Sequence, residues 1–125
     1  MPLKSKDKRN FFTSVKDCLN GLTFVIVNES NFKRELFLGI IALILSYILK
    51  ISKMEFIIVL IVIALVLVSE VFNTAIEKTV DLCTSKYNET ARIAKDVAAF
   101  GVLLTSFFAL MVGLIIFGSK LIGGI

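Results

Sequence analysis

Hydrophobic residues fall into three long blocks along the chain, separated by polar segments. The blocks run from Leu36 to Leu49, from Phe56 to Ser69 and from Val97 to Ser119. None contains a charged residue; the first two have 14 residues each and the third has 23. Apolar runs of this kind are typical of membrane-spanning helices rather than of one soluble core. The pattern predicts three membrane helices, at about 32–51, 54–82 and 94–120.

The first two blocks are short for a membrane. A helix of 14 residues is about 21 Å long, whereas the hydrocarbon core of a bilayer is about 30 Å thick. Both helices must therefore extend into their polar flanks, or the bilayer must thin around them. We accordingly expect the second helix to have a cytosolic extension, and Glu70 to lie near a membrane boundary rather than at the midplane.

A fourth helix is expected before the first block. Its apolar stripe consists of Phe11, Val15, Leu19, Leu22 and Ile26. This spacing is typical of an amphipathic helix, here at about 10–28, and such a helix lies in the membrane interface. The expected fold is an all-α membrane protein. One membrane domain, residues 1–125, would consist of the interfacial helix and three transmembrane helices.

Composition and charge agree with this class. Apolar residues make up 57% of the chain, and the mean hydropathy is +0.89, too high for a soluble domain of this size. The net charge is +4, but the basic residues sit beside apolar blocks, which favours anionic lipid headgroups over nucleic acid. Because the chain has no histidine, histidine catalysis and histidine metal ligands are excluded. Oxygen ligands remain, and these suit magnesium.

The distribution of basic residues predicts the orientation. Seven precede the first block and four lie between the second and third, whereas only three (Lys50, Lys53 and Lys120) fall on the other side. Positive residues favour the cytosolic face. We therefore expect a multi-pass protein of the bacterial cytoplasmic (inner) membrane, with its N-terminus and the segment between the second and third blocks in the cytosol.

A polar stripe follows the second block. On a helix, Glu70, Asn73, Glu77 and Asp81 would lie within about 80° of one another. A solvated helix face is one interpretation. The other is a functional site, because no basic residue on the stripe compensates its carboxylates and because ionisable groups this near a membrane are costly.

The residue types on this stripe suit one kind of chemistry. Carboxylates on one face suit magnesium, and magnesium suits phosphoryl transfer. A poorly hydrated carboxylate has a raised pKa, which suits a general base acting on an alcohol. Glu29 is a second acid expected at the same boundary, and Lys95 and Asp96 add a cation for phosphate and another acid.

At these residues the chain resembles a known family. The runs that carry the resemblance are Glu70-Val-Phe-Asn73-Thr-Ala-Ile-Glu77-Lys-Thr-Val-Asp81, Ala94-Lys95-Asp96 and Asn28-Glu29-x-x-Phe32-Lys33-x-Glu35. Their order and spacing are similar to the signature of the prokaryotic diacylglycerol kinases, which include the undecaprenol kinases of Gram-positive bacteria. The resemblance extends from about Asn20 to the end of the chain.

The resemblance implies a role for each matching residue. Glu70 would be the catalytic base that takes the proton of the lipid hydroxyl, and Glu29 and Glu77 would hold the Mg²⁺ bound to ATP. The residues that would place the nucleotide or support the site are Asn73, Asp81, Lys95 and Asp96. The resemblance also implies a homotrimer whose sites are shared between subunits.

Some positions depart from the family pattern. Lys86 and Asn88 stand where members often carry an acid and a histidine, which leaves the nucleotide contacts of the 84–92 segment open. Arg9 is one position away from alignment with a family arginine. The substrate also stays open between undecaprenol and diacylglycerol. A chain rich in Lys, Ile, Phe and Asn and without Trp is typical of low-GC Gram-positive bacteria, which favours undecaprenol.

Two other classes compete with a lipid kinase. A small transporter or pore subunit would use the acids to carry a proton or cation, but such acids usually lie within a span rather than at its end. A lipid phosphatase would lack the usual histidines. The Gly113-x-x-x-x-Gly118-Ser119-Lys120 run differs from a P-loop, because its last pair is reversed and no strand precedes it.

Overall fold

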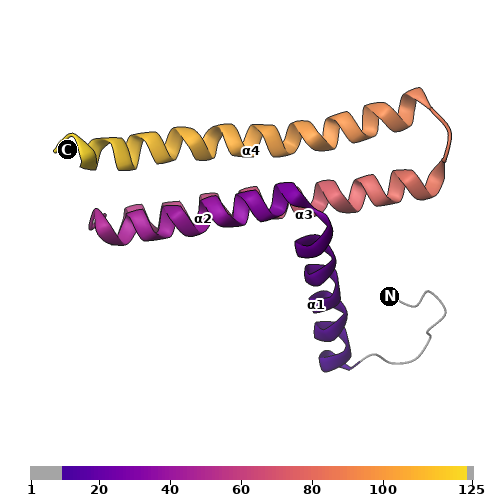
Figure 1. Cartoon of the computed structure of the whole chain (residues 1–125), viewed down its shortest axis with the longest axis horizontal. Helices are drawn as coiled ribbons and strands as arrows, with labels where there is room; N and C mark the ends of the chain where they lie inside the picture. The colour runs from indigo at the N-terminus through magenta and orange to yellow at the C-terminus, as the bar shows by residue number, and fades with distance from the viewer. Residues whose placement is uncertain (1–9, 124–125) are drawn as a thin grey trace.

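The computed structural model describes residues 10–123, and within this range the protein consists of four helices and no strand (Figure 1). The helices are α1 (Phe11–Asn28), α2 (Ser30–Ile48), α3 (Lys53–Cys83) and α4 (Glu89–Leu121). The all-helical prediction is therefore confirmed. Arg9 lies outside the described residues.

The two longest helices form the body of the molecule. α3 and α4 run antiparallel and side by side, and α2 packs along α3 (Figure 1). The hydroxyls of Ser69 and Thr105 lie 2.9 Å apart and join α3 to α4 beside Glu70. α1 runs across the direction of the other three helices, and α3 and α4 continue past the junction of α1 and α2 (Figure 1).

Local side-chain contacts explain where the helices begin. The Ser52 hydroxyl accepts a hydrogen bond from the Glu55 backbone at 3.1 Å, and the Glu55 carboxylate accepts one from the Ser52 backbone at 3.0 Å, which is a capping box. The Asn88 side chain caps α4 by accepting from the Ala91 backbone at 2.9 Å. This cap explains why α4 begins at Glu89, before the predicted start near residue 94.

One glycine allows α2 and α3 to approach closely. A Cβ atom added at Gly39 would lie 3.0 Å from the Ile63 Cγ2 atom. The contact lies in the part of the two helices where Val59 and Val66 are buried. Gly39 therefore sets the spacing of α2 from α3.

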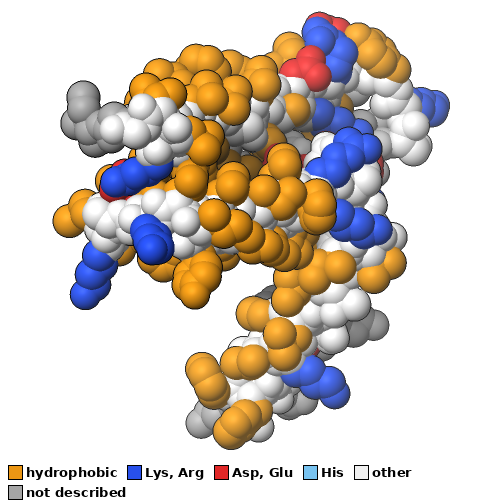
Figure 2. All heavy atoms as spheres, turned by 60° about the vertical axis from the view of Figure 1, so that its left-hand side comes forward, with side chains coloured by type: hydrophobic (Ala, Val, Ile, Leu, Met, Phe, Trp, Pro, Cys, Tyr) orange, Lys and Arg blue, Asp and Glu red, His pale blue; other side chains and the backbone are white. Residues whose placement is uncertain are grey.

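The outer surface of the bundle is apolar. Figure 2 shows hydrophobic side chains over its sides and charged side chains toward its ends. Among the described residues, α3 and α4, with 31 and 33 residues, are long and apolar enough to cross a membrane. α2 has only 19 residues and carries Lys33, Arg34 and Glu35 near its start. Two candidate spans are thus observed, and a third span in α2 stays a prediction.

Candidate active site

The most unusual side chain of the described structure is Glu70 in α3. Glu70 is only 1% exposed, and its side chain is the largest that is fully buried among the described residues. One of its carboxylate oxygens, Oε2, has no hydrogen-bond partner. The Asn31 side chain bonds the carboxylate, and Glu29 and Glu77 act on it electrostatically. A buried carboxylate with two acidic neighbours is costly for folding, which indicates a chemical role.

The junction of α1 and α2 brings Glu29 and Asn31 to Glu70. Glu29 has an extended backbone (φ −106°, ψ 103°) and separates the two helices. The Arg34 guanidinium donates to the Asn31 Oδ1 atom at 3.2 Å. Because that oxygen is engaged, the Asn31 amide group is directed to donate to Glu70.

The polar stripe predicted on α3 is present and partly buried. The Asn73 Nδ2 atom donates to the Glu77 Oε1 atom at 3.2 Å, one helical turn away. Asn73 is buried, and its Oδ1 atom has no partner. From α2, Glu35 adds another partnerless buried oxygen and acts electrostatically on Glu70. Several oxygen atoms without protein partners therefore gather around Glu70.

Asp81 and Lys95 form a second polar cluster beyond this stripe. The Lys95 Nζ atom lies 2.6 Å from the Asp81 Oδ1 atom and joins α3 to α4. Asp81 lies beyond the charge-free segment that ends at Ser69. The hydrogen bond from Lys95 holds the pKa of Asp81 below its usual value. A cleft of 340 Å³ opens beside the pair. The charged and aromatic side chains that line it are Asp81, Lys86, Tyr87, Arg92 and Lys95.

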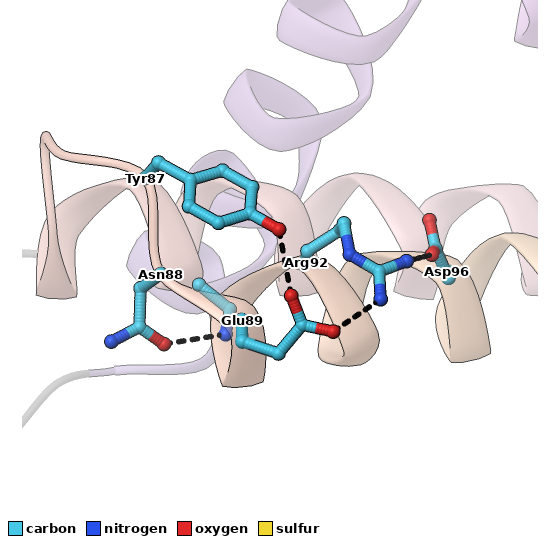
Figure 3. A network of polar contacts seen from close by, with 6 residues as sticks. Tyr87, Asn88, Glu89, Arg92 and Asp96 are labelled. Atoms are coloured by element: carbon cyan, nitrogen blue, oxygen red, sulfur yellow. Dashed lines mark hydrogen bonds and ion pairs between the residues drawn. The ribbon is translucent and has the colours of Figure 1, made fainter.

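Asp96 does not take part in the ion pair that its neighbour Lys95 forms with Asp81. The Arg92 guanidinium donates to Asp96 at 2.8 Å and to Glu89 at 2.5 Å (Figure 3). Glu89 also accepts a bond of 2.6 Å from the Tyr87 hydroxyl. These side chains are exposed. Successive residues of a helix point about 100° apart, which explains why Lys95 and Asp96 take different partners.

A groove begins beside Glu35 and runs along the bundle. α2, α3 and α4 line it, and it measures 760 Å³. Asn31, Arg34 and Glu35 lie at its polar end, whereas its remaining lining is largely apolar, from Leu38 to Leu121. A space with one polar end and apolar walls suits a molecule with a polar head and a hydrocarbon chain.

In the described residues, no group of three or more acidic or cysteine side chains is arranged to hold a metal ion. Sequence reasoning also gave no role to Asn31, Glu35 or Thr74, which are all near or on the buried stripe. Glu35 belongs to the run that carries the family resemblance, whereas the only signal for Asn31 was its closeness to Glu29 in the sequence. Asparagine and threonine are common in helices, so their type alone carried no signal.

Comparisons with known proteins identify the class. Residues 16–117 match the family described as prokaryotic diacylglycerol kinase. The chain is 35% identical over 123 residues to the undecaprenol kinase of Bacillus subtilis (strain 168), an alignment that covers 95% of this chain and 100% of that protein.

Two diacylglycerol kinases are also similar to the chain. That of Haemophilus influenzae is 31% identical, over 81% of this chain and 86% of that protein. That of a Synechocystis strain is 31% identical, over 83% of this chain and 60% of that protein. The chain is thus a lipid kinase, a class that uses ATP as phosphoryl donor. The chain belongs to the prokaryotic diacylglycerol kinase family.

Proposed function

We propose that this kinase transfers the γ-phosphoryl group of ATP to the hydroxyl of undecaprenol and forms undecaprenyl phosphate. The Bacillus subtilis relative supports this substrate, because it bears that name and aligns over its whole length. Diacylglycerol, the substrate in the names of the other two relatives, is the alternative. The 760 Å³ groove with one polar end suits the long hydrocarbon chain of either lipid.

Glu70 acts as the general base. The observation that carries this role is a buried carboxylate, 1% exposed, with one oxygen free of protein partners. Its oxygen accepts the proton of the lipid hydroxyl while the lipid oxygen bonds to the γ-phosphorus, and ADP leaves with the electrons of the broken bond. The Asn31 contact orients the carboxylate.

Glu29 and Glu77 hold the Mg²⁺ that accompanies ATP. Both carboxylates act electrostatically on Glu70, Glu29 from the junction of α1 and α2 and Glu77 from α3 itself. Magnesium prefers oxygen ligands and commonly uses one or two carboxylates together with phosphate oxygens. The partnerless Oδ1 atom of Asn73 suits the same cation. When bound, the ion would neutralise charge on the transferring phosphoryl group.

The remaining site residues bind the nucleotide. Asn73 lies on α3 between Glu70 and Asp81, and its side-chain amide orients the Glu77 carboxylate through their 3.2 Å hydrogen bond. Asp81 and Lys95 lie at the cationic cleft of 340 Å³, which is large enough for part of a nucleotide. Asp96 acts from the exposed side through Arg92. Phosphoryl transfer depends mainly on such positioning and on charge.

The protein works in the bacterial cytoplasmic membrane. α2, α3 and α4 span it, and α1 lies in the interface with the N-terminus in the cytosol. The crossing direction of α1 (Figure 1) and its exposed apolar residues support this arrangement. The active form is a homotrimer with shared sites, which the apolar faces left exposed on α3 and α4 can accommodate.

A kinase assay with both lipids tests the function. Purified protein receives γ-labelled ATP and Mg²⁺ with undecaprenol or with diacylglycerol, and label in the extracted lipid is measured. We expect faster labelling of undecaprenol. Equal turnover of both lipids would remove the preference, and no labelling of either would reject the proposed reaction.

A further inference from the structure

Thr74 has a buried hydroxyl that no protein group satisfies. The residue is 4% exposed, and its Oγ1 atom has no hydrogen-bond partner. Six other helical hydroxyls behave differently, since each donates to a backbone carbonyl about one turn earlier. They are those of Thr23, Ser46, Ser69, Thr79, Thr105 and Ser119. Thr74 does not make the local bond that is usual in these helices.

Its position places Thr74 inside the candidate active site. It follows Glu70 by four residues on α3, so the two side chains lie on the same face of the helix. Asp81, which pairs with Lys95, lies further along the same face. The Thr74 hydroxyl therefore lies between the proposed base and the proposed nucleotide cleft.

The neighbouring groups explain what such a hydroxyl could bind. Glu70 and Glu77 are carboxylates, which accept hydrogen bonds when ionised, and the Asn73 amide nitrogen already donates to Glu77. A transferring phosphoryl group carries negative charge on its oxygens and needs donors. Thr74 is a buried donor on this stretch of α3 for which the described structure shows no partner.

We propose that Thr74 is a further substrate-binding residue, whose hydroxyl donates a hydrogen bond to a phosphoryl oxygen of the nucleotide during transfer. This role rests on the kinase reaction proposed above. It assigns, on the part of α3 between Glu70 and Asp81, a buried donor that is not already bonded to a protein carboxylate. The bond would form only with nucleotide bound, which explains why the hydroxyl is left without a partner in the chain alone.

The isosteric change Thr74→Val tests this role. Valine keeps the shape and removes the hydroxyl, whereas Thr74→Ser keeps the hydroxyl. We expect Thr74→Val to lower kcat by about tenfold to a hundredfold, the effect of one lost transition-state donor, with the lipid KM unchanged. Thr74→Ser should stay close to the wild type. Thr79→Val is the matched control, because Thr79 is exposed and bonds the Ala75 carbonyl at 2.8 Å.

Thermal unfolding separates substrate binding from a structural role. Without nucleotide, Thr74→Val should have a Tm equal to or above that of the wild type, because removing an unpaired buried hydroxyl costs nothing. The rise in Tm on adding Mg²⁺ and a non-hydrolysable ATP analogue should be smaller in Thr74→Val than in the wild type or Thr74→Ser.

Three results would overturn the role of Thr74. They are unchanged kcat in Thr74→Val, a lower Tm without nucleotide, and an undiminished rise in Tm with the analogue. Wild-type protein that phosphorylates no lipid would instead reject the proposed function. In that case the Tm rise with the analogue still decides whether Thr74 contacts a nucleotide.

Discussion

Asp81 and Lys95 connect α3 to α4 through a contact of 2.6 Å, although they lie 14 positions apart in the sequence. Both side chains are largely exposed (56% and 41%). An exposed ion pair adds little to stability, because solvent screens the charges and holding two long side chains in place costs entropy. The contact therefore matters more for the position of two charges beside the 340 Å³ cleft than for holding the helices together.

Asp81→Asn and Lys95→Met should accordingly weaken nucleotide use more than folding. We expect the KM for ATP to rise several-fold in each variant, while the Tm changes by a few degrees at most. A double-mutant cycle on the ATP KM would measure the coupling. Glu55→Gln is the control, because Glu55 also contacts a basic side chain, Lys120, but at the other end of α3. An additive cycle would contradict a joint role for the pair.

The same pair predicts a pH dependence. Lys95 holds the pKa of Asp81 below its usual value, and Asp81 holds that of Lys95 above its usual value. The stabilisation from Asp81 is present above the ordinary pKa of an aspartate and is lost as the pH falls through the lowered one. The stabilisation from Lys95 is lost only as the pH rises through its raised pKa. The coupling in the cycle should thus be constant across neutral pH and disappear in acid.

Glu70→Gln should abolish catalysis without unfolding the protein. Glutamine keeps the size of the side chain but cannot take a proton, and loss of a general base costs about 10²–10⁴-fold in rate. Expression and the detergent-extracted oligomer should be unchanged, because the variant removes a buried charge. Glu55→Gln, at the other end of α3, is the control and should retain turnover. Near wild-type turnover in Glu70→Gln would remove the base assignment.

Glu77→Gln and Glu29→Gln should change the metal dependence. Each removes one of the two carboxylates that flank Glu70, so half-maximal activity should need a higher Mg²⁺ concentration. Loss of one ligand should weaken the ion about tenfold or more. Saturating Mg²⁺ should restore part of the rate. Titrations of turnover against Mg²⁺ that coincide with the wild type would show that these acids do not hold the ion.

The sequence predicted the helices better than the contacts between them. Helical spacing was enough to place Glu70, Asn73 and Glu77 on one face of α3, because the face depends only on the helical repeat. Lys95 and Asp96 are adjacent, and their separation onto different partners required the packing of α4 against α3. The direction of α1 likewise required its junction with α2.

The missed residues share one physical reason. Asn31 and Thr74 have neutral side chains that are common on helix surfaces, so a pattern cannot distinguish them from solvated residues. What marks Asn31 is its contact with Glu70, and what marks Thr74 is a buried hydroxyl without a partner. Both are properties of packing. The start of α4 was placed late because it depends on the Asn88 cap and not on hydrophobicity.

The close approach of α2 to α3 at Gly39 predicts that a substitution outside the acidic site will lower activity. An alanine Cβ there would meet the Ile63 Cγ2 atom at 3.0 Å, so Gly39→Ala should push α2 from α3. Because α2 carries Asn31 and Glu35 toward Glu70, we expect kcat to fall several-fold. Gly101→Ala is the control, since nothing lies within 4 Å of its added Cβ. It should retain activity and gain up to about 1 kcal/mol from helix propensity.

The second substitution Ile63→Leu should rescue Gly39→Ala. Leucine moves the side-chain branch one carbon away from the backbone and so removes the methyl group that the new Cβ would meet. The double variant should recover most of the lost kcat, whereas Ile63→Leu alone should have little effect, as volume-conserving core changes usually do. If Gly39→Ala loses activity and the second change restores none of it, the spacing of α2 and α3 does not position the site.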